Sequence, residues 1–215
     1  MKLIDEIKVI NGVSKITITI DNMGKVVLKH SKDVKKKSLE AFVNNKSEWI
    51  IKKREEKLDA ISKHLDFINY EKVEIFGVKY DLKKGKRNRV INNETIVYTN
   101  TKSLINSITK LSFDKFKKKL LHFTKMIKVS PSNIMFDNSK TRWGVCTSKK
   151  IVKINFRAVM LPEHLLDYIL IHELCHLVQF NHSALFWKEV GKYCKDYKQC
   201  KADIKEYSFL LELYR

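Results

Sequence analysis

The feature that most constrains the fold is a strongly apolar segment that runs from Pro162 to Phe180. Its leucines and isoleucines recur at the spacing of a helix, and proline is favoured at the first helical position. The segment therefore predicts a helix that begins at Pro162 and ends near Phe180. Polar side chains on such a helix are at least half-buried, so each of them needs a partner.

Two histidines of this helix stand in the pattern His-Glu-x-x-His, formed by His172, Glu173 and His176. Residues four apart lie one turn apart on the same side of a helix, so both imidazoles can reach one ion at about 2.0–2.1 Å. Glu173 flanks the pair and can hold a metal-bound water, as general-base hydrolysis requires. The pattern predicts a site for one Zn²⁺ ion, with His172 and His176 as ligands and Glu173 as the catalytic base.

A catalytic zinc site needs a third protein ligand and one position left open for water. His182 is the leading candidate, but a continuing helix would carry it about 9 Å further along the axis. The chain must therefore turn back after His176, and Asn181 tolerates the left-handed backbone that ends many helices. Glu189, from the next helix, is the alternative third ligand.

The composition limits the class of protein. The chain has 215 residues and is 44% hydrophobic, which excludes a wholly disordered chain. Its formal charge of +19 suggests a polyanionic partner such as nucleic acid, but lysines scattered over a solvated surface are the favoured explanation of the charge. No apolar run has the length of a membrane helix, and no signal peptide or CxxC pair is evident. These features lead us to expect a cytoplasmic protein with free thiols and no membrane partner.

Strand and helix signals predict two domains, residues 1–100 and 101–215. The first begins with a hairpin whose strands cover Val13 to Ile20 and residues 26–28. Asp33 and Ser47 are expected to cap two following helices. The second helix carries Trp49, Ile50, Leu58, Ile61 and Leu65 on one face, and strands over residues 73–82 and 95–99 follow it.

In the second domain, Ser112 is expected to begin an amphipathic helix that extends to Ile127. Three short strands follow at residues 134–136, 142–146 and 152–156, and Ser183 is expected to cap a later helix. The predicted fold class is α+β, with an N-terminal β-hairpin and helix module before a C-terminal domain of helices over a small antiparallel sheet.

Several motifs between residues 140 and 190 resemble one known family. They are Thr141 to Lys150, Ile154 to Arg157, His172 to Leu177, Asn181-His182-Ser183 and Phe186-Trp187. Together they resemble the YgjP-like metal-dependent hydrolases, which are related to the SprT/Spartan-like proteases. The resemblance implies a zincin-like C-terminal domain and a zinc peptidase activity, with three histidine ligands and a catalytic Glu173. Val145 and Thr147 replace serines of the family pattern and Lys150 replaces a glycine, so the substrate contacts are expected to differ.

The leading functional hypothesis is a zinc-dependent peptidase that acts on peptides or proteins. The segment from Arg142 to Cys146 could form an edge strand that pairs with an extended peptide. Arg142, Trp143 and Asn155 are the candidate substrate-binding residues, although core packing or turn hydrogen bonds would explain them as well. The alternatives are a metal-dependent nuclease, a structural zinc site on a nucleic-acid-binding protein, and a protease that acts on nucleic-acid-bound proteins.

Overall fold

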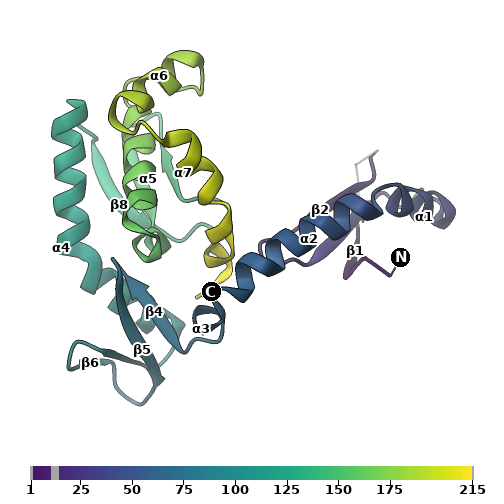
Figure 1. The fold of residues 1–215 in the computed structure, drawn as a ribbon, viewed down its shortest axis with the longest axis horizontal. Helices are drawn as coiled ribbons and strands as arrows, with labels where there is room; N and C mark the ends of the chain where they lie inside the picture. Colours follow the sequence, from purple (N-terminus) through teal and green to yellow (C-terminus); the bar gives the residue numbers. More distant parts are fainter. Residues whose placement is uncertain (1, 11–14, 215) are drawn as a thin grey trace. The chain divides into compact units, whose positions relative to one another are not determined.

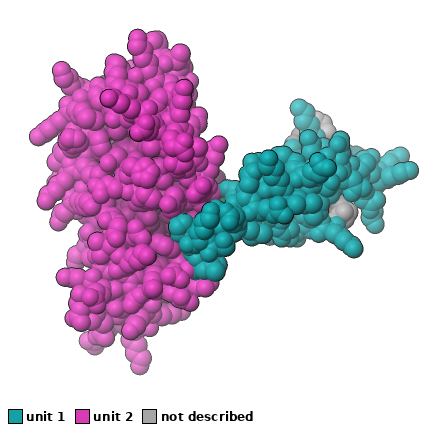
Figure 2. All heavy atoms as spheres, in the orientation of Figure 1, with its two compact units in different colours: residues 1–65 teal, residues 66–215 magenta. Residues whose placement is uncertain are grey.

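The computed structural model describes residues 2–10 and 15–214 and shows a mixed α+β protein (Figure 1). The chain divides into two compact units, residues 1–65 and 66–215, which Figure 2 colours separately. The domain boundary expected after residue 100 falls inside the second unit, immediately before a long helix. Among the described residues, no helix combines the length and the apolar character of a membrane span.

The first unit consists of a three-stranded sheet and two helices. The strands are β1 (Glu6–Val9), β2 (Thr17–Ile20) and β3 (Val26–His30), and the helices are α1 (Lys36–Asn45) and α2 (Ser47–Ser62). Strand β3 lies in the middle, antiparallel to β2 and parallel to β1. The antiparallel pair is the hairpin that the sequence predicted, but its first strand begins at Thr17, and Val13 lies outside the described residues.

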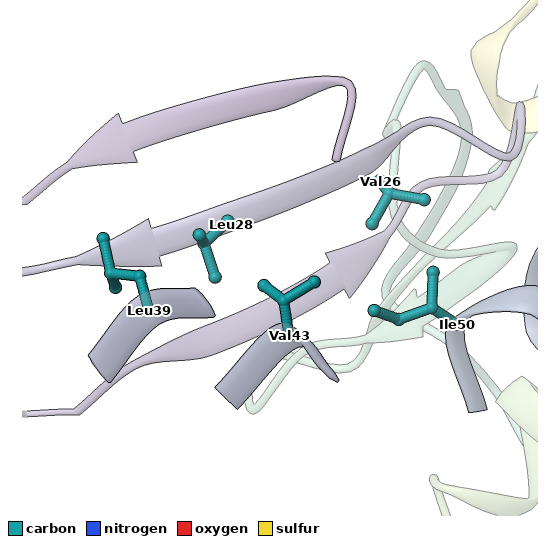
Figure 3. Close-up of a cluster of buried hydrophobic side chains, with 5 residues drawn as sticks. All are labelled: Val26, Leu28, Leu39, Val43 and Ile50. Carbon is teal, nitrogen blue, oxygen red and sulfur yellow. The ribbon is translucent and has the colours of Figure 1, made fainter. Parts of the chain in front are cut away.

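The core of the first unit lies between the sheet and the helices (Figure 3). Alternation along β3 places two of its side chains on one face, where they meet three side chains from the helices. The buried cluster is Val26, Leu28, Leu39, Val43 and Ile50. The apolar face expected on α2 is mostly exposed instead, because Ile50 is the only buried residue of this helix.

Both helix caps expected in the first unit are wrong. Asp33 lies instead in a turn, which is closed by a hydrogen bond from the Val34 N–H to the Ser31 carbonyl. Helix α1 begins only after Lys35. Ser47 is the first residue of α2 rather than its cap, and its hydroxyl donates a hydrogen bond to the Asn44 carbonyl.

The second unit begins with a four-stranded sheet next to a long helix. The elements are α3 (Leu65–Ile68), which crosses the boundary between the units, β4 (Lys72–Ile75), β5 (Val78–Lys84), β6 (Arg89–Ile91), β7 (Thr95–Tyr98) and α4 (Thr101–Ile127). The single strand expected over residues 73–82 is a hairpin of two strands, because Phe76 and Gly77 both have positive φ angles. Helix α4 begins at Thr101 rather than at Ser112, because Asn100 and Ser103 form a capping box before it.

The remaining elements place the predicted histidine helix in the centre of the second unit. They are β8 (Asn133–Asp137), β9 (Gly144–Cys146), β10 (Ile151–Asn155), the 3₁₀-helix η1 (Phe156–Met160), α5 (Glu163–Cys175), α6 (Ala184–Tyr193), α7 (Tyr197–Asp203) and the 3₁₀-helix η2 (Glu206–Glu212). Helix α5 lies between α4 and α7 and also contacts β9 and α6 (Figure 1). Strand β10 is antiparallel to β9 but parallel to β8, so the small sheet is mixed rather than purely antiparallel.

Candidate metal centre

Three histidines converge at the end of α5. The Nε2 atoms of His172 and His182 lie 3.1 Å apart. One ring nitrogen from each of His172, His176 and His182 lies within 4.8 Å of the other two. Among the described residues, no other group of three such side chains comes together in this way. Three imidazole nitrogens at this separation can bind one metal ion and leave a further position open.

A turn after α5 brings His182 back towards the helix. The helix ends at Cys175 rather than near Phe180, and the backbone N–H groups of Val178 and Gln179 both donate to the Cys175 carbonyl. Asn181 contributes through its side chain, which accepts hydrogen bonds from the Ser183 N–H and the Gln179 amide. Asn181 is not among the described residues that have a positive φ angle, so the left-handed backbone expected at this residue was wrong.

Burial keeps His172 and His176 neutral. The pKa of His172 is lowered to about 3, first by burial and then by the neighbouring His176 and His182. Burial also lowers the pKa of His176, whose Nδ1 lies 3.3 Å from the Gln179 carbonyl. A neutral imidazole with a free ring nitrogen is the form that binds a metal ion. The donor set therefore fits Zn²⁺.

Aromatic side chains of α6 pack against all three imidazoles. The buried Phe186 ring stacks on His176 at 4.4 Å and makes edge contacts with His172 at 4.9 Å and His182 at 4.8 Å. Trp187 lies 5.7 Å from both His172 and His182. From the sequence, Phe186 was expected only as part of the Phe186-Trp187 motif of the family, without a role at the metal site. Its position four residues after His182 was the signal that could have linked it to the site.

Glu173 lies beside the histidines with its carboxyl group buried. The residue is 6% exposed, and this burial raises its pKa to about 8, against the opposing effects of a hydrogen bond from the Cys146 backbone and the charge of Arg142. A carboxyl group with a raised pKa can take up and release a proton near neutral pH. Glu173 and His172 line the same two cavities, so this group has access to whatever binds there.

The other sequence candidates separate into two groups. Arg142 and Trp143 line a cavity that also contains His172 and Glu173. Asn155 is fully buried, and its amide donates hydrogen bonds to the carbonyls of Ser139 and Arg142. Asn155 therefore holds the loop before β9 in place, and it does not line either of the two cavities that contain Glu173.

The alternative third ligand has a different partner. Glu189 forms an ion pair with Lys192, one turn along α6. Its carboxylate is not part of the group of converging ligand atoms that the described residues contain.

Comparison with known proteins assigns the chain to a family. A family model described as the YgjP-like metallopeptidase domain matches residues 14–207. The chain belongs to the YgjP-like family. The protein is accordingly a metal-dependent hydrolase of the peptidase type, which confirms the family and the enzyme class expected from the motifs. A search of curated proteins found no match.

Two solved structures of metallopeptidase zymogens resemble part of this YgjP-like chain. Abylysin from Pyrococcus abyssi is 24% identical with a TM-score of 0.38, over 41% of this chain and 90% of its own. Jannalysin from Methanocaldococcus jannaschii is 25% identical with a TM-score of 0.38, over 41% of this chain and 92% of its own.

We expect Gly144→Ala to impair this YgjP-like metallopeptidase severely. A Cβ atom at residue 144 would lie 2.6 Å from Cγ of Glu173, so β9 or the glutamate must move. Overpacking of this kind costs roughly 1–3 kcal/mol of stability. Thermal unfolding and peptide cleavage should both be measured, with the catalytic loss exceeding what the unfolded fraction explains. Gly191→Ala on α6 is the matched control, because its Cβ would meet only the Tyr197 ring, at 3.5 Å. Full activity of the Gly144→Ala protein would contradict the close contact.

Proposed function

We propose that the protein is a zinc-dependent peptidase whose zincin-type site is built from four residues. His172, His176 and His182 hold one zinc ion, and Glu173 is the general base. The observation that carries this proposal is the convergence of three imidazole nitrogens next to a buried carboxyl group. All four residues lie within residues 101–215, the segment that we propose as the peptidase domain.

The chemistry follows from the positions of these groups. A zinc ion held here would lower the pKa of a coordinated water towards about 7 and polarise a substrate carbonyl. Glu173 takes a proton from the attacking water and later delivers it to the leaving amine. The position of Glu173 supports this role, because it lines both cavities together with His172 and can reach a water bound in either of them. The contacts of Phe186 with the three histidines keep their rings in place during both steps.

Strand β9 supplies a backbone surface for a peptide substrate. It is an edge strand of its sheet within the described residues, because β10 pairs with one side of it only. Its residues Gly144, Val145 and Cys146 line the cavity that contains the three histidines. An extended peptide can add to such an edge through main-chain hydrogen bonds, which places a peptide bond next to Glu173.

The test is a comparison of substrates with and without metal. Protein stripped by a chelator and reloaded with one equivalent of Zn²⁺ is expected to cleave fluorescently labelled casein, whereas the stripped protein is inactive. The same reloaded protein is expected to leave an RNA oligonucleotide intact. Cleavage of RNA with intact casein would overturn the peptidase proposal and favour the nuclease alternative.

A further inference from the structure

Two cavities meet at the His172–Glu173 pair. Both are lined by Gly144, His172 and Glu173. The first, which we name the Arg142 cavity, has a volume of about 230 Å³ and is also lined by Arg142, Trp143, Tyr168, Ile169 and Ile204. The second, which we name the Phe180 cavity, has a volume of about 300 Å³ and is also lined by Val145, Cys146, His176, Phe180 and His182.

Strand β9 runs from one cavity to the other, with its amino end at the Arg142 cavity and its carboxyl end at the Phe180 cavity. The Trp143 carbonyl accepts a hydrogen bond from the Asn155 N–H, and the Thr147 N–H donates to the Ile151 carbonyl, so these groups face β10. By the alternation of an antiparallel ladder, the N–H and C=O groups of Gly144 face the free edge. The Cys146 N–H also faces that edge, where it donates to Glu173.

These positions fix the direction of a bound peptide if it pairs with β9 in the more stable antiparallel sense. The peptide then runs from the Phe180 cavity to the Arg142 cavity and passes Glu173 between them. The residue before the cleaved bond lies at the Phe180 cavity, and the residue after it lies at the Arg142 cavity.

The Arg142 cavity has the chemistry of a pocket for an apolar side chain. Tyr168 and Ile169 are buried and form fixed walls, and the half-buried Trp143 and Ile204 complete them. Arg142 is the exception, but its Nε lies 3.8 Å from an Asp137 carboxylate and its side chain is 54% exposed, so its charge is partly balanced and reaches solvent.

The Phe180 cavity offers less basis for selecting a side chain. Three of its lining residues are the histidines of the metal centre, and Phe180 is 55% exposed at its rim. A side chain placed there meets the metal centre on one side and solvent on the other, so little apolar area is buried.

We infer that this peptidase selects substrates by a large apolar or aromatic residue directly after the cleaved bond, which enters the Arg142 cavity. The inference rests on the proposed peptidase function. It makes Ile204 a specificity-determining residue, because Ile204 lines the Arg142 cavity from the end of α7 and belongs to neither the metal centre nor the general base.

Cleavage of a random peptide mixture by zinc-loaded protein, followed by mass spectrometry of the fragments, tests the inference. Fragments that begin with Phe, Leu, Ile, Trp or Tyr are expected to be enriched, with no comparable enrichment of residues before the cleaved bond. In Ile204→Trp protein the added ring fills the cavity. The ratio of kcat/KM for Phe over Ala after the bond is expected to fall by roughly tenfold or more. Ile204→Ala should instead favour Trp at this position.

Leu185→Trp is the matched control, because Leu185 is 66% exposed on α6 and lines neither cavity. It should leave the Phe-to-Ala ratio unchanged. A readout independent of turnover is calorimetric binding of product-like peptides to metal-free protein. Peptides that begin with Phe should bind more tightly than peptides that begin with Ala, and Ile204→Trp should remove the difference.

The outcomes separate the inference from the function on which it rests. If no peptide in the mixture is cleaved, the proposed function fails. If peptides are cleaved without a preference after the bond, or with the apolar preference before it, the specificity inference is overturned while the peptidase function stands. An equal change in the Leu185→Trp and Ile204→Trp ratios would also overturn the inference.

Discussion

Glu173→Gln is expected to lower kcat for peptide cleavage by roughly 100- to 10,000-fold, the range attributed to a general acid–base group. Glutamine keeps the size of the side chain and its place behind Gly144, but it cannot accept and return a proton. The three histidines are unchanged, so the variant should bind one equivalent of zinc with the affinity of the wild-type protein. Elemental analysis and steady-state kinetics on the same preparation measure both quantities.

Glu163→Gln is the control for this substitution. Glu163 lies in the first turn of the same helix, where it forms ion pairs with Lys115 and Lys119 on the surface of α4. Removing its charge should change kcat little, because it has no contact with the site and its side chain is 51% exposed. A Glu173→Gln protein that retains turnover would remove Glu173 from the mechanism, whereas a loss of bound zinc would show that it supports the metal instead.

The parts of the site that could be predicted from the sequence are those set by helix geometry. His172 and Glu173 lie in the last turn of α5 and His176 directly follows it with a helical backbone conformation, so their spacing alone places the two imidazoles on one side. The approach of His182 to the other two histidines could not be predicted from spacing alone, because it depends on where α5 ends. The sequence does not mark Cys175 as the last residue of α5, yet the early end allows the turn through Gln179 that brings His182 back.

The parts that could not be predicted depend on partners far away in the sequence. Asn155 was a substrate candidate, but its amide contacts carbonyls 13 and 16 residues earlier, which local patterns do not reveal. The parallel pairing of β8 with β10 is another long-range choice. The wrong start for α4 has a local cause, because Asn100 and Ser112 are both of a residue type that caps helices. At Asn100 the reciprocal contact with Ser103 decides the start of α4.

The identity of the third ligand is the other prediction with a large expected effect. His182→Ala is expected to weaken zinc binding by more than about 100-fold, which is the upper range for losing only an outer partner of a metal ligand. The reason is geometric, since Nε2 of His182 lies 3.1 Å from Nε2 of His172. Competition with a chromogenic chelator measures the affinity. Because a ligand that binds only the folded state raises the melting temperature, added zinc should stabilise the wild-type protein more than the variant.

Glu189→Ala decides between the two candidate ligands. Glu189 lies on α6 next to the aromatic residues that pack on the histidines, but its carboxylate pairs with Lys192 and is absent from the converging group. Its removal should leave zinc affinity and the zinc-dependent rise in melting temperature close to wild type. The opposite pattern, with zinc lost on Glu189→Ala and retained on His182→Ala, would mean that α6 supplies the third ligand. The three histidines would then be close in space without all binding the metal, and the stacking of Phe186 would have to be explained by packing alone.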